Sequence, residues 1–165
     1  MQENTKNKRQ VVLDTETTGL DPNSGHRIIE IGCVEMVDRM LTGKTLHFYF
    51  NVDRKIDPQA VAVHGITNEF LEDKPKFVDK VDDIIAFLNN SEVLIHNAPF
   101  DVGFLESEFS KLPDSSAFQN AKLSRYSKIT DTLSIAKKKH PRQRNSLDAL
   151  CKRYKIDNTH RTLHG

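Results

Sequence analysis

The sequence contains few cysteines, no tryptophan and no long apolar run. Its 165 residues include two cysteines, Cys33 and Cys151, which are isolated and lack the spacing of metal ligands. We therefore expect both to be reduced, partly buried thiols in a cytoplasmic protein. No apolar stretch approaches the roughly 20 residues that a membrane-spanning helix needs. The first ten residues are polar where a signal peptide would be apolar, so we expect neither a membrane span nor an export signal.

The sequence also lacks an excess of charge of either sign. Its 24 lysines and arginines oppose 23 acids, for a net charge of +1, which is not the global signature of a nucleic-acid-binding protein. The charge is uneven, however, because residues 137–155 hold eight lysines or arginines and one acid, Asp148. Such a stretch can hold phosphate groups while the remaining surface stays neutral. A solvated helix face would show the same pattern.

The hydrophobic pattern predicts one α/β domain. Residues 1–8 are interpreted as a flexible polar leader and residues 9–165 as the domain. Strands are predicted at residues 11–13, 28–37, 46–52 and 93–95 and near Ile129, and helices at residues 77–88, from Asn97 to about Phe109, at 132–139 and at 147–154. Gly43 predicts a tight turn that joins the second and third strands into a hairpin. Three strands followed by alternating helices and strands predict a mixed sheet with helices on both faces.

Two carboxylates, Asp14 and Glu16, directly follow the buried run Val11 to Leu13. Side chains alternate along a strand, so the two share one face near the end of the strand. Like charges this close raise each other's pKa unless a cation neutralises them, and Mg²⁺ is the usual partner of oxygen ligands. Acids are poor strand residues, which favours a metal site over a chance arrangement.

A third carboxylate, Asp101, lies in the first turn of the helix that Asn97 opens as the expected N-cap. The helix dipole alone favours an acid there, so a structural role is the alternative. The strand at residues 93–95 is expected beside the first strand. Asp101 would then reach the same sheet edge as the first two carboxylates.

His160 and His164, near the end of the sequence, are candidates for a general base. A reaction in which a metal-bound water attacks a substrate needs a group that deprotonates this water, and histidine titrates in the appropriate range. A lone histidine near a terminus is more often a surface residue, so neither one identifies a site by itself.

Six sequence segments in a fixed order carry a family resemblance. They are Val12 to Gly19, Ile28 to Gly32, Val63 to Thr67, His96 to Asp101, Arg144 to Cys151 and Arg161 to Gly165. Through them the chain resembles the proofreading exonuclease (epsilon) subunits of bacterial DNA polymerase III, in the DEDDh exonuclease superfamily. The resemblance extends from about Gln10 to Gly165. It implies a ribonuclease-H-like fold with a five-stranded mixed sheet.

The resemblance also implies a reaction, in which the terminal phosphodiester at a DNA 3′ end is hydrolysed and 5′ mononucleotides are released. Two Mg²⁺ or Mn²⁺ ions would bind Asp14, Glu16 and Asp101, and His164 would accept the proton of the attacking water. The single-stranded or frayed 3′ end would contact Asp14, Thr15, Glu16, Thr17, Gln59, His64 and Asn97. The implied protein partners are the DNA polymerase III alpha subunit and other subunits of the polymerase core.

The sequence departs from this family in two places. The family has a histidine followed five residues later by an aspartate, but Gly165 stands five residues after His160. We therefore take His164 as the base and expect the fourth metal aspartate and its C-terminal helix to be missing, which predicts weaker metal binding and lower stability. Gln59 stands where some members have glutamate, so it can hydrogen-bond but carries no charge. Taken alone, His64 would be an ordinary loop histidine.

Two other functions remain open at this point. One is an RNA-processing 3′–5′ exonuclease of the same superfamily, with the same chemistry. The other is a non-catalytic scaffold that steadies a polymerase, which the missing fourth acid suggests. The segment Arg144 to Cys151 favours the polymerase subunit over an RNA-processing enzyme. A scaffold would have no need of the set Asp14, Glu16, Asp101 and His164.

Overall fold

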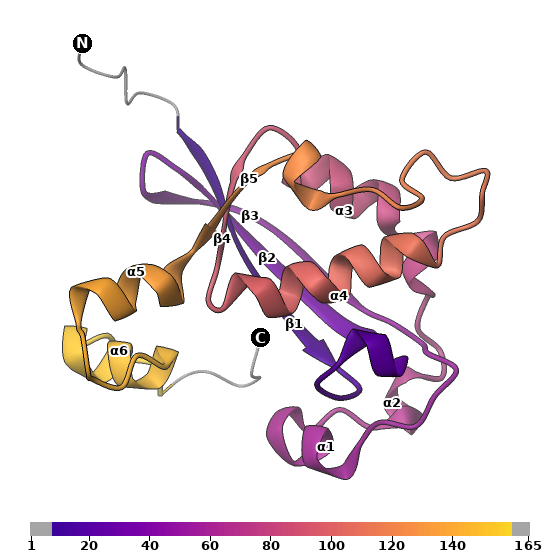
Figure 1. The fold of residues 1–165 in the computed structure, drawn as a ribbon, viewed down its shortest axis with the longest axis horizontal. Coiled ribbons are helices and arrows are strands. Elements are labelled where there is room, and N and C mark those ends of the chain that lie inside the picture. Colours follow the sequence, from indigo (N-terminus) through magenta and orange to yellow (C-terminus); the bar gives the residue numbers. More distant parts are fainter. Residues whose placement is uncertain (1–7, 160–165) are drawn as a thin grey trace.

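A five-stranded sheet with strand order β3-β2-β1-β4-β5 forms the centre of the structure (Figure 1). This computed structural model describes residues 8–159. The strands are β1 (Arg9–Thr17), β2 (Ile28–Val37), β3 (Met40–Tyr49), β4 (Glu92–Ile95) and β5 (Lys128–Asp131). β2 runs antiparallel to β1 and β3, whereas β4 is parallel to β1 and β5 is parallel to β4. The predicted α/β class with a mixed sheet is confirmed, and so is the pairing of residues 93–95 with the first strand.

The helices are α1 (Pro58–His64), α2 (Asn68–Leu71), α3 (Val81–Leu88), α4 (Ala98–Ser110), α5 (Thr132–Lys139) and α6 (Leu147–Tyr154), with 3₁₀ turns at Pro22–Ser24, Phe77–Asp79 and Leu123–Arg125. The bounds of α5 and α6 are those predicted from the sequence. The hydrophobic pattern does not predict α1 and α2, because their seven and four residues are too short to show a helical period. No helix among the described residues is long and apolar enough to cross a bilayer.

The turn between β2 and β3 corrects one prediction. Asp38 and Arg39 form the turn, and both have positive φ (51° and 68°), which is the conformation of a two-residue hairpin turn. Gly43 is not the turn residue. It lies inside β3 with φ 84°, near a register shift between Val34 and Met36, where glycine tolerates a bulge. The predicted third strand at residues 46–52 therefore begins earlier, at Met40, and ends at Tyr49.

The two faces of β1 differ. Val11 and Leu13 are buried in the main core, which also contains the apolar side chains of α3 and α4. In Figure 1, α4 crosses this face of the sheet. On the alternate face Asp14 and Glu16 are partly exposed, and Val12 is 41% exposed. The strand thus presents carboxylates on the face opposite the packed helices.

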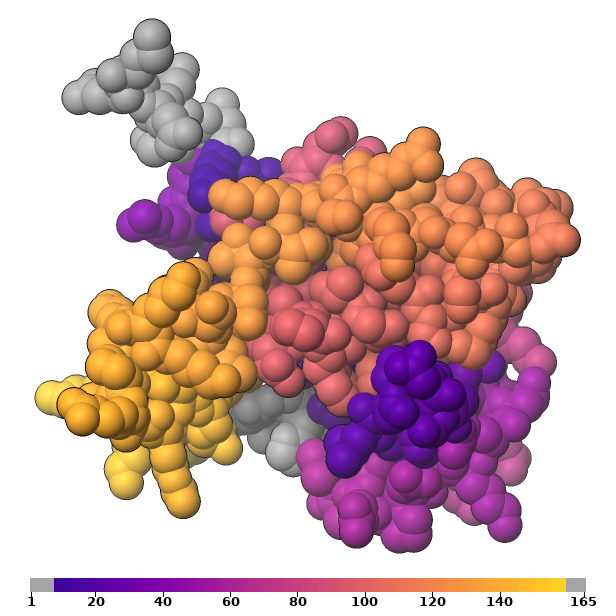
Figure 2. Space-filling model, in the orientation of Figure 1, coloured from indigo at the N-terminus to yellow at the C-terminus, as the bar shows by residue number. Residues whose placement is uncertain are grey.

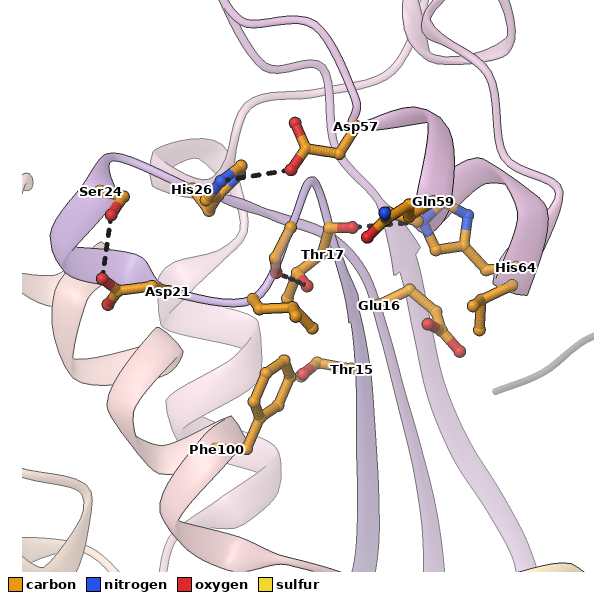
Figure 3. Close-up of a pocket in the computed structure, with 14 residues that line it drawn as sticks. Thr15, Glu16, Thr17, Asp21, Ser24, His26, Asp57, Gln59, His64 and Phe100 are labelled. Atoms are coloured by element: carbon orange, nitrogen blue, oxygen red, sulfur yellow. Dashed lines mark hydrogen bonds and ion pairs between the residues drawn. The ribbon is translucent and has the colours of Figure 1, made fainter.

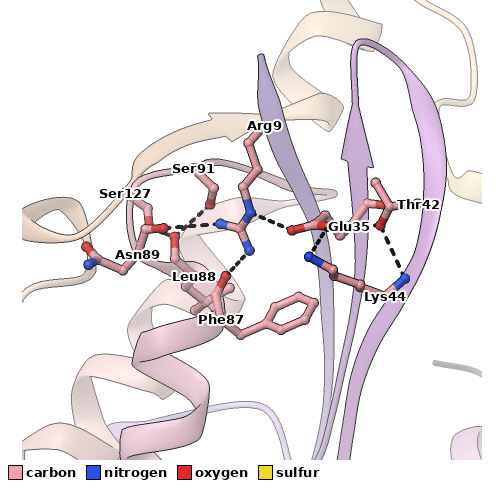
Figure 4. Close-up of polar contacts among 9 residues, drawn as sticks. All are labelled: Arg9, Glu35, Thr42, Lys44, Phe87, Leu88, Asn89, Ser91 and Ser127. Atoms are coloured by element: carbon pink, nitrogen blue, oxygen red, sulfur yellow. Dashed lines mark hydrogen bonds and ion pairs between the residues drawn. The ribbon is translucent and has the colours of Figure 1, made fainter. Parts of the chain in front are cut away.

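Arg9 fastens the end of α3 to the sheet (Figure 4). Its guanidinium donates to the Glu35 carboxylate at 2.5 Å, to the Phe87 carbonyl at 2.6 Å and to the Asn89 carbonyl at 3.1 Å. One side chain therefore satisfies backbone acceptors at the end of α3 and a buried acid of β2. This network lies at the opposite end of β1 from Asp14, because Arg9 begins the strand.

Arg27 and Glu108 join the start of β2 to α4. The Arg27 Nε and Nη2 atoms each donate to one Glu108 oxygen at 2.7 Å, and Ile28 N donates to the same carboxylate at 3.1 Å. The Glu108 residue is 2% exposed, so its charge depends on these donors. The hydrogen bond to Glu108 raises the pKa of Arg27 above its ordinary value.

We predict that Arg27→Met lowers the free energy of unfolding by about 3 kcal/mol, because it leaves a buried carboxylate without its cation. The double variant Arg27→Met/Glu108→Gln should recover most of that loss, since the amide oxygen still accepts from Ile28 N. Urea unfolding of the three proteins measures both effects. A loss of less than about 1 kcal/mol in Arg27→Met would show that this pair is not needed to hold α4 on β2.

Candidate active site

The end of β1 and the first turn of α4 meet at a pair of hydrogen bonds. Thr15 donates to Asp101 Oδ1 twice, from its backbone N at 3.0 Å and from its Oγ1 at 2.6 Å. β1 and β4 are parallel, so the chain leaves both strands at the same edge, where α4 begins. The predicted placement of Asp101 at the edge that carries Asp14 and Glu16 is confirmed. Thr15 is the residue that holds it there.

The carboxyl of Asp101 lies in an unfavourable electrostatic environment. Asp101 is 3% exposed. Its pKa is raised to about 7, mainly by burial and also by the nearby Asp14 carboxylate, while the hydrogen bonds from Thr15 lower it. Near neutral pH the carboxyl therefore carries only part of its charge. A cation beside Asp14 and Asp101 would relieve both the burial and the repulsion.

The chemistry of these side chains fits a divalent metal ion. Asp14, Glu16 and Asp101 offer only carboxylate oxygens, which suit hard ions such as Mg²⁺ or Mn²⁺. Within residues 8–159, no group of three or more histidine, cysteine or acidic side chains is gathered closely enough to be a metal site by itself. Asp14, Glu16 and Asp101, which all lie within this range, do not form such a group. The candidate bases His160 and His164 lie outside the described residues.

A cavity of about 490 Å³ opens beside Glu16 (Figure 3), which is the usual size of a small-molecule site. Most of its lining comes from the end of β1, the loop that follows it and helix α1. The lining residues are Thr15, Glu16, Thr17, Gly19, Leu20, Asp21, Ser24, His26, Asp57, Gln59, Ala60, Val63, His64 and Phe100. Five predicted substrate-binding residues are therefore brought together around one cavity, namely Thr15, Glu16, Thr17, Gln59 and His64. Asp14 and Asn97 are not among its lining residues.

The ring of His64 is buried, and hydrogen bonds fix its orientation. Ile66 N donates to His64 Nδ1 at 3.1 Å, so the ring proton is placed on Nε2. Nε2 lies 3.2 Å from the carbonyl oxygen of Thr17 and donates to it. The end of α1 is thereby tied to the strand that carries the carboxylates.

A second link holds the beginning of α1. Thr18 Oγ1 accepts from Arg27 N at 3.0 Å and shares a hydrogen bond of 2.9 Å with His26 Nδ1. His26 Nε2 is 3.5 Å from a carboxylate oxygen of Asp57, the N-cap residue of α1 (Figure 3). Asp57 N also donates to the Thr18 carbonyl at 2.9 Å. The end of α1 is therefore positioned against the last residue of β1, and its beginning against the loop that follows β1.

Sequence reasoning missed the apolar part of the cavity. Leu20 is 80% exposed and Val63 is 58% exposed, while the ring of Phe100 is partly buried at the start of α4. These side chains form apolar walls of the kind against which a nucleobase and its sugar can pack. An exposed leucine is not informative in a sequence. No pattern indicated that Val63 lies on a helix.

Asn97 has a different environment from the one expected. It occupies the N-cap position of α4 as predicted, but its side chain makes no capping hydrogen bond. Its φ of 72° places it in the left-handed region, which asparagine tolerates better than most residues. Its backbone N donates to Asp131 Oδ1 at 3.0 Å, so Asn97 links the start of α4 to the end of β5.

We predict that Asp101→Asn flattens the dependence of stability on pH in the metal-free protein. The pKa of this carboxyl is about 7 in the folded state against 3.8 as its ordinary value. Between these values the folded state binds more protons, so the free energy of unfolding falls as pH rises from about 4 to about 7. Asparagine does not titrate, so that part of the fall should disappear. Urea unfolding at several pH values measures it.

Added Mg²⁺ near pH 8 should restore stability to the unsubstituted protein but not to Asp101→Asn. Asp82→Asn, on the exposed side of α3, is the matched control and should keep both responses. Equal pH profiles for the unsubstituted protein and Asp101→Asn would contradict the electrostatic account of the site.

The chain is similar to bacterial replication proteins. Residues 11–165 match the model of the RNase T exonuclease family. DNA polymerase III subunit epsilon of Escherichia coli is 51% identical over 161 residues, which cover 95% of this chain and 65% of that protein. The same subunit of Rickettsia felis is 50% identical over 157 residues, which cover 95% of this chain and 67% of that protein. The chain thus spans about two thirds of the length of these curated relatives.

Solved exonuclease structures share the fold. Exonuclease X, in complex with 5′-overhanging duplex DNA, has a TM-score of 0.67 and 28% identity, over 94% of this chain and 79% of that chain. Exonuclease I, in complex with an inhibitor, has a TM-score of 0.74 and 18% identity, over 96% of this chain and 39% of that chain. The likeness to exonuclease I concerns the fold alone. From the family model and these relatives, the chain belongs to the RNase T exonuclease family, within which it is similar to the epsilon subunits of bacterial DNA polymerase III.

Proposed function

We propose that this chain is a 3′–5′ exonuclease domain that hydrolyses the terminal phosphodiester of a DNA strand and releases 5′ mononucleotides. The observation that carries the proposal is the Asp101 carboxyl, held beside the charge of Asp14 by Thr15, a residue that also lines a nucleotide-sized cavity. The carboxylates suit a phosphate with its metal ions, and the cavity suits the sugar and base attached to that phosphate. A phosphodiesterase that acts on a chain end needs both a site for the phosphate and a site for the terminal nucleoside.

Exonucleases of this family generally use divalent metal ions. For this chain we propose two ions, Mg²⁺ or Mn²⁺, on Asp14, Glu16 and Asp101. When bound, such ions lower the pKa of a water molecule and neutralise charge on the phosphate. Thr15 orients Asp101 for this task, and α1 closes one side of the cavity so that the strand cannot continue beyond the terminal nucleotide. His164 remains the proposed proton acceptor.

The relatives support DNA as the substrate and replication as the setting. About half of the residues are identical to those of DNA polymerase III epsilon subunits over 95% of this chain. Exonuclease X, whose fold is the same, is described in complex with DNA. We therefore propose proofreading at a frayed 3′ end, where an already unpaired nucleotide costs least to move into a pocket. The proposed partner is the alpha subunit of DNA polymerase III.

We predict that Asp14→Asn lowers kcat/KM on a DNA oligonucleotide by more than about 100-fold, because even residues that only orient a metal ligand are worth about 10–100-fold. Thr15→Val should lower it by about 10–100-fold through the lost hydrogen bond to Asp101, and Thr15→Ser should recover most of the loss. Thr130→Val on β5 is the matched control, because it removes a threonine hydroxyl that donates to Glu92 on β4. Activity that survives in Asp14→Asn would show that the metal site is elsewhere.

The nature of the substrate is tested by comparison. A DNA primer with a mispaired 3′ end and an RNA oligomer of equal length are digested with Mg²⁺ and with Mn²⁺. We expect faster release of mononucleotides from the DNA. Faster release from RNA would favour an RNA-processing exonuclease. No release from either, with the chain folded and metal added, would favour the scaffold.

A further inference from the structure

The α5–α6 hairpin, residues 132–155, is strongly basic. Eight lysines or arginines lie between residues 137 and 155, against one acid, Asp148. Seven of the eight are exposed, and Arg153 is partly buried. Figure 2 shows that these helices protrude from the body of the molecule. Within residues 8–159, the ion pairs that engage lysine or arginine involve Lys8, Arg9, Arg27, Lys44, Lys74, Lys76, Lys80, Lys122 and Lys128, and none of them lies on this hairpin.

The turn of the hairpin is ordered by its own hydrogen bonds. The buried Asn145 side chain donates to the carbonyls of His140 and Gln143, at 3.1 and 3.0 Å. Arg153 donates to the carbonyl of Arg144 at 2.8 Å. These bonds fix the backbone on both sides of Arg142. The exposed guanidinium groups of Arg142 and Arg144 are therefore presented from a defined turn.

The hairpin is attached next to the carboxylates. His96 Nε2 donates to the carbonyl of Asn145 at 2.8 Å, and His96 Nδ1 lies 3.0 Å from Thr132 Oγ1. His96 directly precedes Asn97, the N-cap residue of α4, and the first turn of this helix contains Asp101. In Figure 1 the hairpin and α1 lie on different sides of the end of β1. The carboxylates are thus flanked by the nucleotide-sized cavity on one side and by the hairpin on another.

Charge complementarity indicates what would lie on this surface. The centre of the site is acidic, with Asp14, Glu16 and Asp101, and Asp21 and Asp57 border the cavity. A polyanion would be repelled there except at its metal-bound phosphate, so its other phosphates need a cationic surface close by. The hairpin is such a surface, since a phosphate neutralised by lysine or arginine releases condensed counterions.

We propose that the α5–α6 hairpin binds the sugar-phosphate backbone of the nucleic acid strand whose 3′-terminal nucleotide occupies the cavity, at phosphates upstream of the scissile bond. The inference rests on the proposed exonuclease function and adds a direction to it. The strand runs from the hairpin, past Asp14 and Asp101, and ends at α1. Contacts with phosphates carry no sequence information, which suits an enzyme that must remove any terminal nucleotide.

The test uses a triple variant, Lys138→Gln/Arg142→Gln/Arg144→Gln, and two substrates. One is a single-stranded DNA of about 12 nucleotides, within the span of single-strand binding sites. The other is the nitrophenyl ester of thymidine 5′-monophosphate, which reaches the cavity and the carboxylates but has no upstream phosphate. In the triple variant we expect KM for the oligonucleotide to rise by about 10-fold or more at low salt. KM for the ester should stay within about twofold of the unsubstituted value.

The dependence on salt gives a second readout. Three lost contacts with a single strand should make the slope of log(kcat/KM) against log[salt] shallower by about 2, at about 0.7 per contact. The matched control, Arg39→Gln/Lys44→Gln/Lys128→Gln, removes the same charge far from the carboxylates. Arg39 and Lys44 lie at the β2–β3 hairpin and Lys128 at the start of β5. The control should keep the KM and the salt slope of the unsubstituted protein.

Equilibrium binding separates this inference from the proposed activity. A fluorescent oligonucleotide is titrated in Ca²⁺, with anisotropy as the signal, so that the result does not depend on hydrolysis. Weaker binding by the triple variant than by the control supports the hairpin surface even if the chain hydrolyses neither substrate, an outcome that would refute only the activity. Equal affinity and equal salt slopes in the two variants would overturn the inference and favour a protein partner on this surface.

Discussion

The hydrogen bonds from Thr15 to Asp101 are the interaction on which the rest of the site depends. They join two segments 86 residues apart, the end of β1 and the first turn of α4. Because Thr15 lies between Asp14 and Glu16 and faces the core, the same residue that holds Asp101 leaves its two neighbours on the opposite face. An acid buried to this extent would otherwise disfavour folding. The site is thus a local exception to the burial rules, and the two donors of Thr15 stabilise it.

Where the sequence analysis succeeded, local chemistry was sufficient. The alternation of side chains along a strand placed Asp14 and Glu16 on one face, and the helices predicted at residues 132–139 and 147–154 match α5 and α6. The predicted turn at Gly43 was wrong, because a glycine between two strands usually indicates a turn. Here Asp38 and Arg39 adopt the left-handed conformation themselves. Only the pairing register of β2 with β3 distinguishes the two arrangements, and a pairing register is a property of two strands together.

The cavity beside Glu16 was the less predictable part. The family resemblance named Gln59 and His64, but neither residue carries a local signal, because α1 is too short for a hydrophobic period. The contacts of Thr18, His26 and Asp57 connect three separate segments and follow from the tertiary structure alone. His164, a central residue of the family match, lies outside the described residues, so the proton acceptor still rests on the resemblance.

The two hydrogen bonds of His64 have a chemical consequence. Its Nδ1 lone pair accepts the amide proton of Ile66, and its Nε2 proton points at the carbonyl of Thr17. An imidazole arranged in this way has its basic lone pair already engaged, so taking up a proton would cost it the bond to Ile66. Although His64 borders the cavity, its hydrogen bonds serve to hold the end of α1 against β1. In the proposed hydrolysis, the proton that the attacking water loses must therefore go to a group other than His64.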